Sequence, residues 1–105
     1  MSWSDKRIEA KIERALVEGV KSLGGVAIKI APVSFVGLPD RLILLPGGIA
    51  AFVELKSPGQ TPTPRQNWWL RRLSALGFSV GWFDDLAGVD ALLRDLRVLQ
   101  ARFRA

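Results

Sequence analysis

Hydrophobic positions recur at helical spacing near the start of the chain, and this pattern predicts an α-helix over residues 5–23. Ser4 can cap the start of this helix, and the pair Gly24-Gly25 can end it. The positions that we expect to face the core are Ile8, Ile12, Leu16, Val20 and Leu23.

Two further amphipathic segments predict helices in the second half of the chain. One begins at Pro64, because proline suits the first turn of a helix, and ends at Gly77. The other follows Asp84-Asp85 and continues to Phe103. Either aspartate can cap it, which explains the pair better than a second metal site does. The apolar positions of these two helices are Trp69, Leu70, Leu73 and Leu76, then Leu86, Val89, Leu92, Leu93, Leu96, Leu99 and Phe103.

Four short apolar runs predict β-strands at residues 26–30, 41–45, 49–56 and 78–83. The first run is stopped at Pro32, and Pro46-Gly47-Gly48 between the second and third is typical of a hairpin. The order is helix, three strands, helix, strand, helix. It predicts a small α/β domain with a mixed β-sheet flanked by helices.

The composition limits the size of the fold and the chemistry. At 105 residues the chain is long enough for one core, so we expect a single domain over residues 1–105. It contains neither cysteine nor histidine, which excludes disulfides, zinc sites built on these residues, and an imidazole base. A net charge of +5 favours an anionic partner, with nucleic acid as the first candidate.

The longest apolar stretch, residues 42–53, is interrupted by Pro46-Gly47-Gly48, so we expect no membrane span. The start of the chain lacks the basic segment and apolar stretch of a secretion signal. We therefore expect a cytoplasmic protein of phage or prokaryotic type.

Charged residues stand at the ends of the two hairpin strands. Side chains alternate along a strand, so Glu54 and Lys56 share a face. If residues 46–48 form a three-residue loop, counting outward places Asp40 opposite Glu54, close enough for both carboxylates to hold one cation. A loop of two or four residues would set Asp40 against Leu55 and break this arrangement.

An opposed pair of carboxylates repels unless a counter-charge lies between them, which gives a reason for a divalent cation. With oxygen ligands alone, the ion should be Mg²⁺ or Mn²⁺, and the Leu55 carbonyl could be a further ligand. Lys56 could orient an attacking water or offset charge on a phosphate, which is typical of phosphodiester hydrolysis. The plainer interpretation is that Asp40 starts a strand and that Glu54 and Lys56 form an exposed pair.

The full set of motifs resembles the PD-(D/E)XK nuclease superfamily, and within it the stand-alone VRR-NUC domains. The similarity rests on Gly37-Leu38-Pro39-Asp40, on Glu54-Leu55-Lys56, and on the Pro-x-Pro-x-Gln spacing that ends at Gln66. It extends over about residues 8–93. The resemblance implies an α-β-β-β-α-β core followed by a C-terminal helix, metal-dependent DNA cleavage, and roles for Asp40, Glu54, Lys56 and Gln66 at the metal site.

Members of this superfamily also place a glutamate on the first helix. The candidates are Glu9, Glu13 and Glu18, and Glu13 fits best because its surroundings resemble the corresponding helix of archaeal Holliday-junction resolvases. Glu13 would then be a further catalytic residue and metal ligand, although a solvated helix face would have a similar sequence.

The helix that follows Gln66 carries basic and aromatic residues beside the expected site. Arg65, Arg71 and Arg72 are candidate phosphate contacts, though a solvated helix face would look the same. Trp68 lies off the apolar face, so we expect it to stack near DNA or to lie in a subunit interface.

Three functions fit the sequence. The first is a metal-dependent, structure-selective DNA endonuclease that resolves four-way (Holliday) junctions as a homodimer, in DNA repair or recombination. The second is a nuclease that acts on flaps or ends as a monomer. The third is a basic DNA-binding module that uses the same fold without cleaving.

Overall fold

A computed structural model describes residues 3–31 and 35–104 of the chain, with side chains over residues 4–31 and 35–102. The elements follow the predicted order. They are α1 (Trp3–Ser22), β1 (Val26–Lys29), β2 (Arg41–Leu45), β3 (Ile49–Leu55), α2 (Pro64–Ala75), β4 (Ser79–Phe83) and α3 (Leu86–Arg104).

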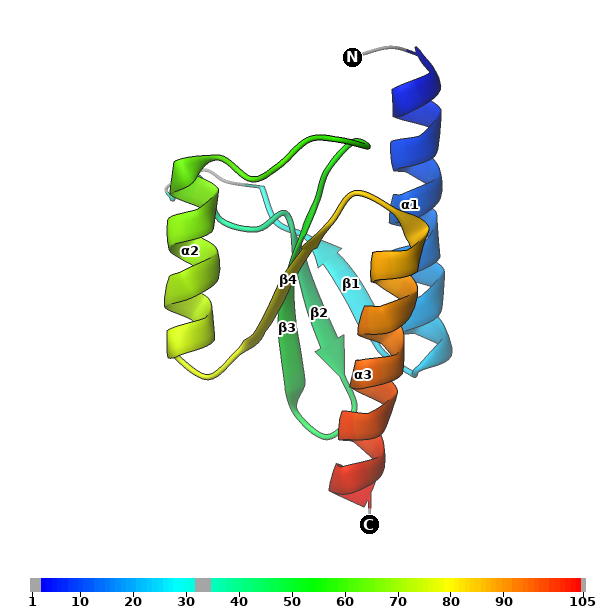
Figure 1. Ribbon diagram of the computed structural model, residues 1–105. Coiled ribbons are helices and arrows are strands. Elements are labelled where there is room, and N and C mark those ends of the chain that lie inside the picture. The colour runs from blue at the N-terminus through cyan, green and yellow to red at the C-terminus, as the bar shows by residue number, and fades with distance from the viewer. Residues whose placement is uncertain (1–2, 32–34, 105) are drawn as a thin grey trace.

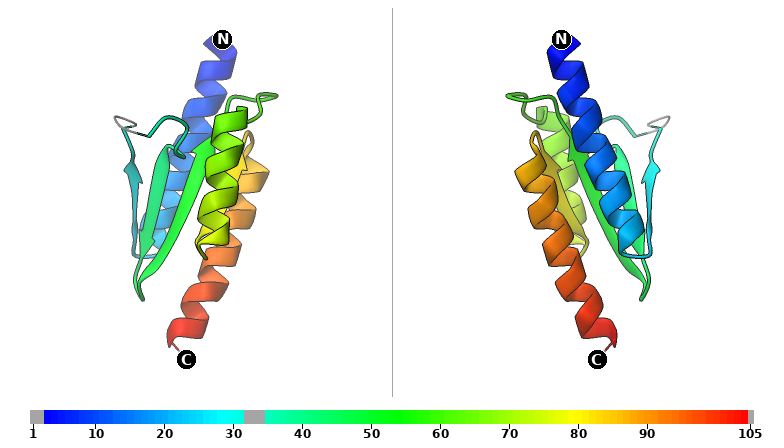
Figure 2. Two further views of the ribbon diagram at one scale, coloured as in Figure 1. Left: turned by 90° about the vertical axis from the view of Figure 1, so that its left-hand side faces the viewer. Right: turned by 90° about the vertical axis from the view of Figure 1, so that its right-hand side faces the viewer.

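The strands form one mixed sheet, as predicted. Their order is β1-β2-β3-β4, with antiparallel pairing among the first three strands and parallel pairing between β3 and β4. Helices α1 and α3 lie side by side on one face of the sheet, and α2 lies on the other (Figures 1 and 2). The result is a three-layer α/β/α sandwich, so the fold-class prediction is confirmed.

The main core lies between the sheet and the pair α1 and α3. Odd-numbered residues of β2 and β3 face these helices, because side chains alternate along each strand. The buried hydrophobic residues of this core are Ile12, Leu16, Val20, Ile43, Leu45, Ile49, Ala51, Val53, Leu55, Val89, Leu92 and Leu96.

No helix of the described chain is apolar over enough of its length to cross a membrane.

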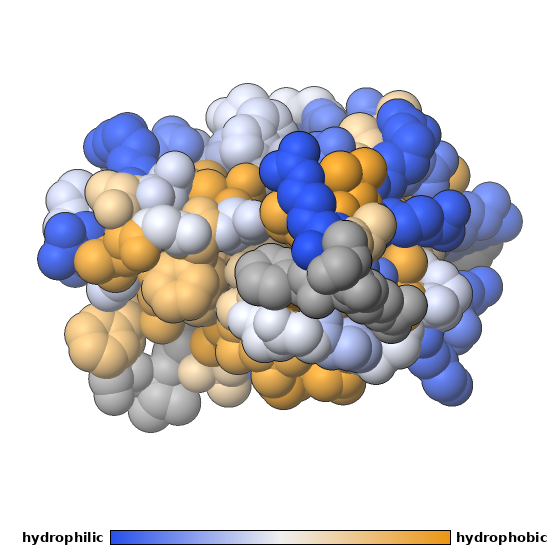
Figure 3. Space-filling view, turned by 90° about the horizontal axis from the view of Figure 1, so that it is seen from below, coloured by the Kyte–Doolittle hydropathy of each residue, from blue (hydrophilic) through white to orange (hydrophobic). Residues whose placement is uncertain are grey.

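The opposite face of the sheet is only half covered. Helix α2 lies over β3 and β4, while no helix of the described residues lies over the β1–β2 half (Figure 2, left). Val26, Ile28 and Leu44 on this half are 51%, 42% and 38% exposed. Viewed along the sheet from below, hydrophobic residues gather on the left and lower parts of the surface (Figure 3). This face therefore has apolar surface available for a partner.

Several predicted helix details differ from the structure. Helix α1 already begins at Trp3, so Ser4 lies inside the helix and does not cap it. Ile8 is 42% exposed because the first turns of α1 extend beyond the sheet, as Figure 1 shows. Leu76 is the C-cap of α2 and is 54% exposed, rather than part of the apolar face.

The two aspartates before α3 have separate roles. Asp85 caps the helix by accepting a hydrogen bond from Gly88 N (2.8 Å), as predicted for one of the pair. Asp84 instead accepts a hydrogen bond from Gly59 N (3.0 Å) and so anchors the loop that follows β3. The predicted stop at Pro32 and the side chain of Phe103 lie outside the described residues.

Candidate active site

The hairpin has the register that brings Asp40 and Glu54 together. Leu45 pairs with Ile49 across a three-residue loop, in which Gly47 and Gly48 have φ values of 93° and 75° that favour glycine. Counting outward along the antiparallel ladder sets Asp40 opposite Glu54. The condition on which the sequence argument depended is therefore confirmed.

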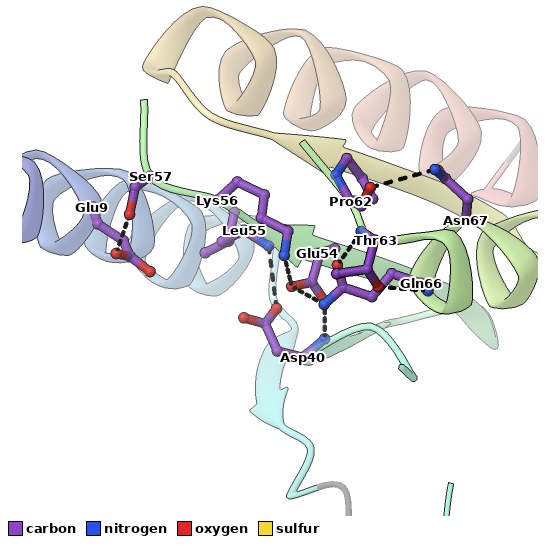
Figure 4. A network of polar contacts seen from close by, with 10 residues as sticks. All are labelled: Glu9, Asp40, Glu54, Leu55, Lys56, Ser57, Pro62, Thr63, Gln66 and Asn67. Carbon is purple, nitrogen blue, oxygen red and sulfur yellow. Dashed lines mark hydrogen bonds and ion pairs between the residues drawn. The ribbon is translucent and has the colours of Figure 1, made fainter. Parts of the chain in front are cut away.

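Hydrogen bonds join Asp40 to Glu54 and to its neighbour Leu55 across the hairpin (Figure 4). Asp40 N donates to Glu54 Oε1 (3.2 Å), and Leu55 N donates to Asp40 Oδ1 (3.3 Å). Each carboxylate thus accepts a backbone hydrogen bond from the opposite strand, which holds both side chains at the same end of the sheet.

Glu54 is 6% exposed and is contacted by two further side chains. Lys56 Nζ lies 3.5 Å from Glu54 Oε2, and Gln66 Nε2 donates to the same oxygen over 3.3 Å. The structure therefore brings together the residues predicted from the two strands and from the start of the next helix.

The first turn of α2 orients Gln66. Thr63 is the N-cap, and its side chain accepts a hydrogen bond from Gln66 N (3.2 Å). In return Gln66 Oε1 accepts from Thr63 N (2.9 Å), which completes a capping box. Because the amide oxygen of Gln66 is used by the cap, its NH₂ group is left to face Glu54.

Both carboxyl groups are harder to ionise than usual. Burial raises the pKa of Asp40, while the Leu55 N–H and the charge of Arg41 act in the opposite direction. Burial also raises the pKa of Glu54, with a further increase from the Asp40 charge and a partial offset from Lys56. Two partly desolvated acids that repel each other are typical of a site made for a cation.

Helix α1 is attached to the site through residues that the sequence analysis did not single out. Arg41, directly after Asp40, forms an ion pair with Glu13 and is 7% exposed. Ser57, directly after Lys56, donates a hydrogen bond to Glu9 Oε2 (2.7 Å). Glu9 and Glu13 are one helical turn apart, so one face of α1 contacts both sides of the site. Strand alternation could have indicated that Arg41 faces α1, but it could not have identified Glu13 as the partner of Arg41.

Glu13 does not join the two opposed carboxylates in this structure. Among residues 3–31 and 35–104, no group of three or more acidic side chains is close enough to hold a metal ion together. Glu13 is engaged by Arg41, yet it lies near enough to raise the pKa of Asp40. Its predicted role as a metal ligand therefore remains a prediction.

The remaining donors suit a hard divalent cation. The hydrogen bond from Leu55 N reaches Oδ1 of Asp40, which leaves Oδ2 as the oxygen that could bind an ion. The N–H and C=O of a strand residue point the same way, so the Leu55 carbonyl is directed to the side where its N–H meets Asp40. Together with Glu54 these are oxygen ligands only, which Mg²⁺ and Mn²⁺ prefer.

The loop before Asp40 packs against the start of α2. Trp69 Nε1 donates to Val36 O (3.1 Å), and a side chain added at Gly37 (φ 92°) would lie 2.5 Å from Arg65 Cγ. Glycine is therefore needed for the loop to approach the helix. This contact fixes Asp40 relative to Gln66.

The basic residues of α2 lie on its outer surface. Arg65, Arg71 and Arg72 are exposed, and Trp68 is 50% exposed, with its ring at right angles to that of Trp69. The predicted phosphate contacts are thus accessible on the helix that carries Gln66.

Comparison with known proteins agrees with this arrangement. No family model matches the chain. A relative described as "Putative nuclease p44", from Acyrthosiphon pisum secondary endosymbiont phage 1, is 47% identical over 72 residues, which are 69% of this chain and 77% of the relative. A solved structure described as "VRR_NUC domain" is similar with a TM-score of 0.75 and 30% identity, over 82% of this chain and 94% of that one.

Proposed function

The chain belongs to the VRR-NUC family of nucleases, and on this premise we propose that it is a metal-dependent DNA endonuclease that cuts four-way junctions as a homodimer. The observation that carries the proposal is the set of Asp40, Glu54 and Lys56 at the ends of two paired strands, with Gln66 donating to Glu54. These are acid, base and amide groups in one small volume, as phosphodiester hydrolysis without histidine requires.

Asp40, Glu54 and the Leu55 carbonyl would hold Mg²⁺ or Mn²⁺. When bound, such an ion supplies positive charge at the scissile phosphate and lowers the pKa of a coordinated water. Glu13 is a candidate further ligand, on the resemblance of α1 to the helix of junction resolvases and on its closeness to Asp40.

Lys56 and Gln66 would each have a separate role at the site. The ammonium group of Lys56, 3.5 Å from Glu54, would orient the attacking water or offset charge that builds on the phosphate. Gln66 fixes the orientation of Glu54, so that the carboxylate need not be reordered when substrate binds.

DNA binding would use the exposed basic residues of α2. Arg65, Arg71 and Arg72 can contact phosphates, and Trp68 can stack on an exposed base or lie against a second subunit. The net charge of +5 would assist association with DNA. A cytoplasmic site of action is part of the proposal, because the DNA of phages and prokaryotes is found there.

A homodimer would match the symmetry of a four-way junction. One site per chain makes one cut at a time, whereas resolution needs two symmetric cuts, and a two-fold dimer supplies both. The uncovered sheet surface at Val26, Ile28 and Leu44 offers apolar area for such an interface, in addition to Trp68.

The decisive experiment incubates the protein with labelled four-way junction, flap and linear duplex in Mn²⁺, with EDTA and the Glu54→Gln variant as controls. We expect paired cuts in the junction, none with either control, and a dimer by light scattering. A monomer that prefers flaps would favour the second function that the sequence allowed. Binding without cleavage in Mn²⁺ or Mg²⁺ would favour a DNA-binding module.

A further inference from the structure

A groove of about 560 Å³ lies between α2 and the edge strand β4, next to the site but not part of it. Its volume is within the range of about 300–1,000 Å³ that is usual for ligand sites. Positions one helical turn apart line it from α2, and the middle of β4 (Ser79–Phe83) lines it from the sheet. The lining includes Asn67, Leu70, Arg71, Ser74, Val80 and Trp82.

The groove begins at the active site. Trp82 is the partner of Glu54 in the parallel β3–β4 ladder, so the two side chains lie on the same face of the sheet on strands about 4.8 Å apart. Asn67 directly follows Gln66, and Figure 4 shows it on the side of α2 nearest to β4. A strand that leaves the scissile phosphate on this side would therefore enter the groove.

The lining suits a nucleotide. Trp82 supplies an aromatic ring, Leu70 supplies apolar contact, and Asn67 supplies amide hydrogen-bonding groups. Arg71 is exposed and forms no ion pair with any residue that the structure describes, so its charge is available to a phosphate. None of the described residues that line the groove is acidic, so none would repel that phosphate.

The same chemistry restricts the occupant to unpaired DNA. Bases inside a duplex are stacked on one another, so a protein ring can stack on a base only where the strand is single or the base is extruded. Stacking on an aromatic side chain tolerates any base, which suits an enzyme that recognises structure rather than sequence.

We propose that this groove binds an unpaired strand of DNA beside the cut, with a base stacked on Trp82 and a backbone phosphate bound by Arg71. The inference rests on the proposed nuclease function and deepens it, because it assigns the recognition of unpaired nucleotides to one side of the site. Branched DNA would then be selected partly by the single-stranded segment that it can place in the groove.

The test measures binding without cleavage, so that it does not depend on activity. A short single-stranded oligonucleotide with one 2-aminopurine is titrated with protein in EDTA, and the quenching of its fluorescence reports stacking. We expect Trp82→Ala to weaken binding about five- to a hundred-fold and to abolish the quenching, since base stacking contributes at this level. Trp82→Phe should keep most of both.

Arg71→Ala has a matched control in Arg94→Ala, which removes an exposed arginine from α3. Only Arg71→Ala should weaken single-strand binding and reduce its salt slope by about one. Thermal melts verify that each variant is folded, and the comparison of Arg71→Ala with Arg94→Ala carries the test if Trp82→Ala is not.

Unchanged single-strand binding and quenching in Trp82→Ala would overturn the groove assignment, even if the protein cuts junctions in Mn²⁺. Loss of stacking in Trp82→Ala from a protein that cuts no DNA would support the groove and contradict the nuclease proposal. The two proposals can therefore fail separately.

Discussion

Replacing Asp40 with asparagine should stabilise the protein when no divalent metal is present. Asparagine keeps the shape of the side chain and the oxygen that accepts from Leu55 N, but it removes the charge that faces Glu54. Directly opposed strand residues have Cβ atoms about 5 Å apart, and two like charges at that distance repel by about 3 kcal/mol at an effective dielectric constant of about 20. Lys56, solvent and the lost attraction to Arg41 reduce this gain. We expect a net gain of about 1 kcal/mol at pH 7, or about 5 °C in Tm.

The gain should depend on pH in a defined direction. Because burial raises the pKa of Asp40 and Glu54, the folded protein holds more protons than the unfolded chain between the ordinary and the raised pKa values. Wild-type stability therefore falls as pH rises through that window, whereas the variant is less affected. As pH falls through this window and the wild-type acids take up protons, the two proteins should converge.

Thermal unfolding followed by circular dichroism in EDTA from pH 4 to pH 8 measures both effects. Asp95→Asn, which removes an exposed acid from α3, is the matched control and should show no pH-dependent gain. Adding Mn²⁺ should stabilise the wild type more than Asp40→Asn. A variant that is less stable than the wild type at pH 7, or a gain that does not change with pH, would refute the account of a repelling pair.

Three further predictions concern the metal, the helix contacts and DNA binding. Mg²⁺ and Mn²⁺ should support cleavage, whereas Ca²⁺ should permit DNA binding with poor turnover, because the longer and looser bonds of Ca²⁺ align water less well. Undiminished cleavage in excess EDTA would exclude a metal-dependent mechanism. Glu13→Ala should lower the free energy of unfolding in urea by about 2 kcal/mol, because it leaves the buried Arg41 without its ion-pair partner. Arg41→Leu should lower it by less, and equal losses in the two variants would argue against this role of Glu13. Binding of duplex DNA, measured by fluorescence anisotropy, should weaken steeply with salt. Arg72→Ala should reduce the slope of log K against log salt concentration by about one, and an unchanged slope would show that Arg72 does not contact DNA.

Local rules were enough to predict the centre of the site. The loop of Pro46-Gly47-Gly48 permitted a register in which Asp40 faces Glu54, and the alternation of strand side chains put Lys56 beside Glu54. The proline predicted the start of α2, but the place of Gln66 at the site came from the resemblance to the VRR-NUC domains. The inferences for Asp40, Glu54 and Lys56 depended on residues of one hairpin.

Contacts between distant elements could not be read in the same way. Arg41 looks like a charge at a strand end, and only the packing of α1 against the sheet shows that it is buried on Glu13. Ile8 follows the helical pattern, but it lies in the first turns of α1, which extend beyond the sheet (Figure 1), and it is 42% exposed. The groove beside Trp82 needs the parallel pairing of β3 with β4, a long-range feature that no short motif contains.

The capping box of α2 has a consequence for the dynamics of the site. Helix ends open and close more readily than helix centres, and here the end residue Gln66 is also the residue that donates to Glu54. An opening of this first turn that moves Gln66 would therefore also break its hydrogen bond with Glu54. The local opening equilibrium of α2 sets an upper limit on the fraction of molecules whose site is assembled at any moment, so hydrogen exchange at the amide of Gln66 would report on the readiness of the enzyme.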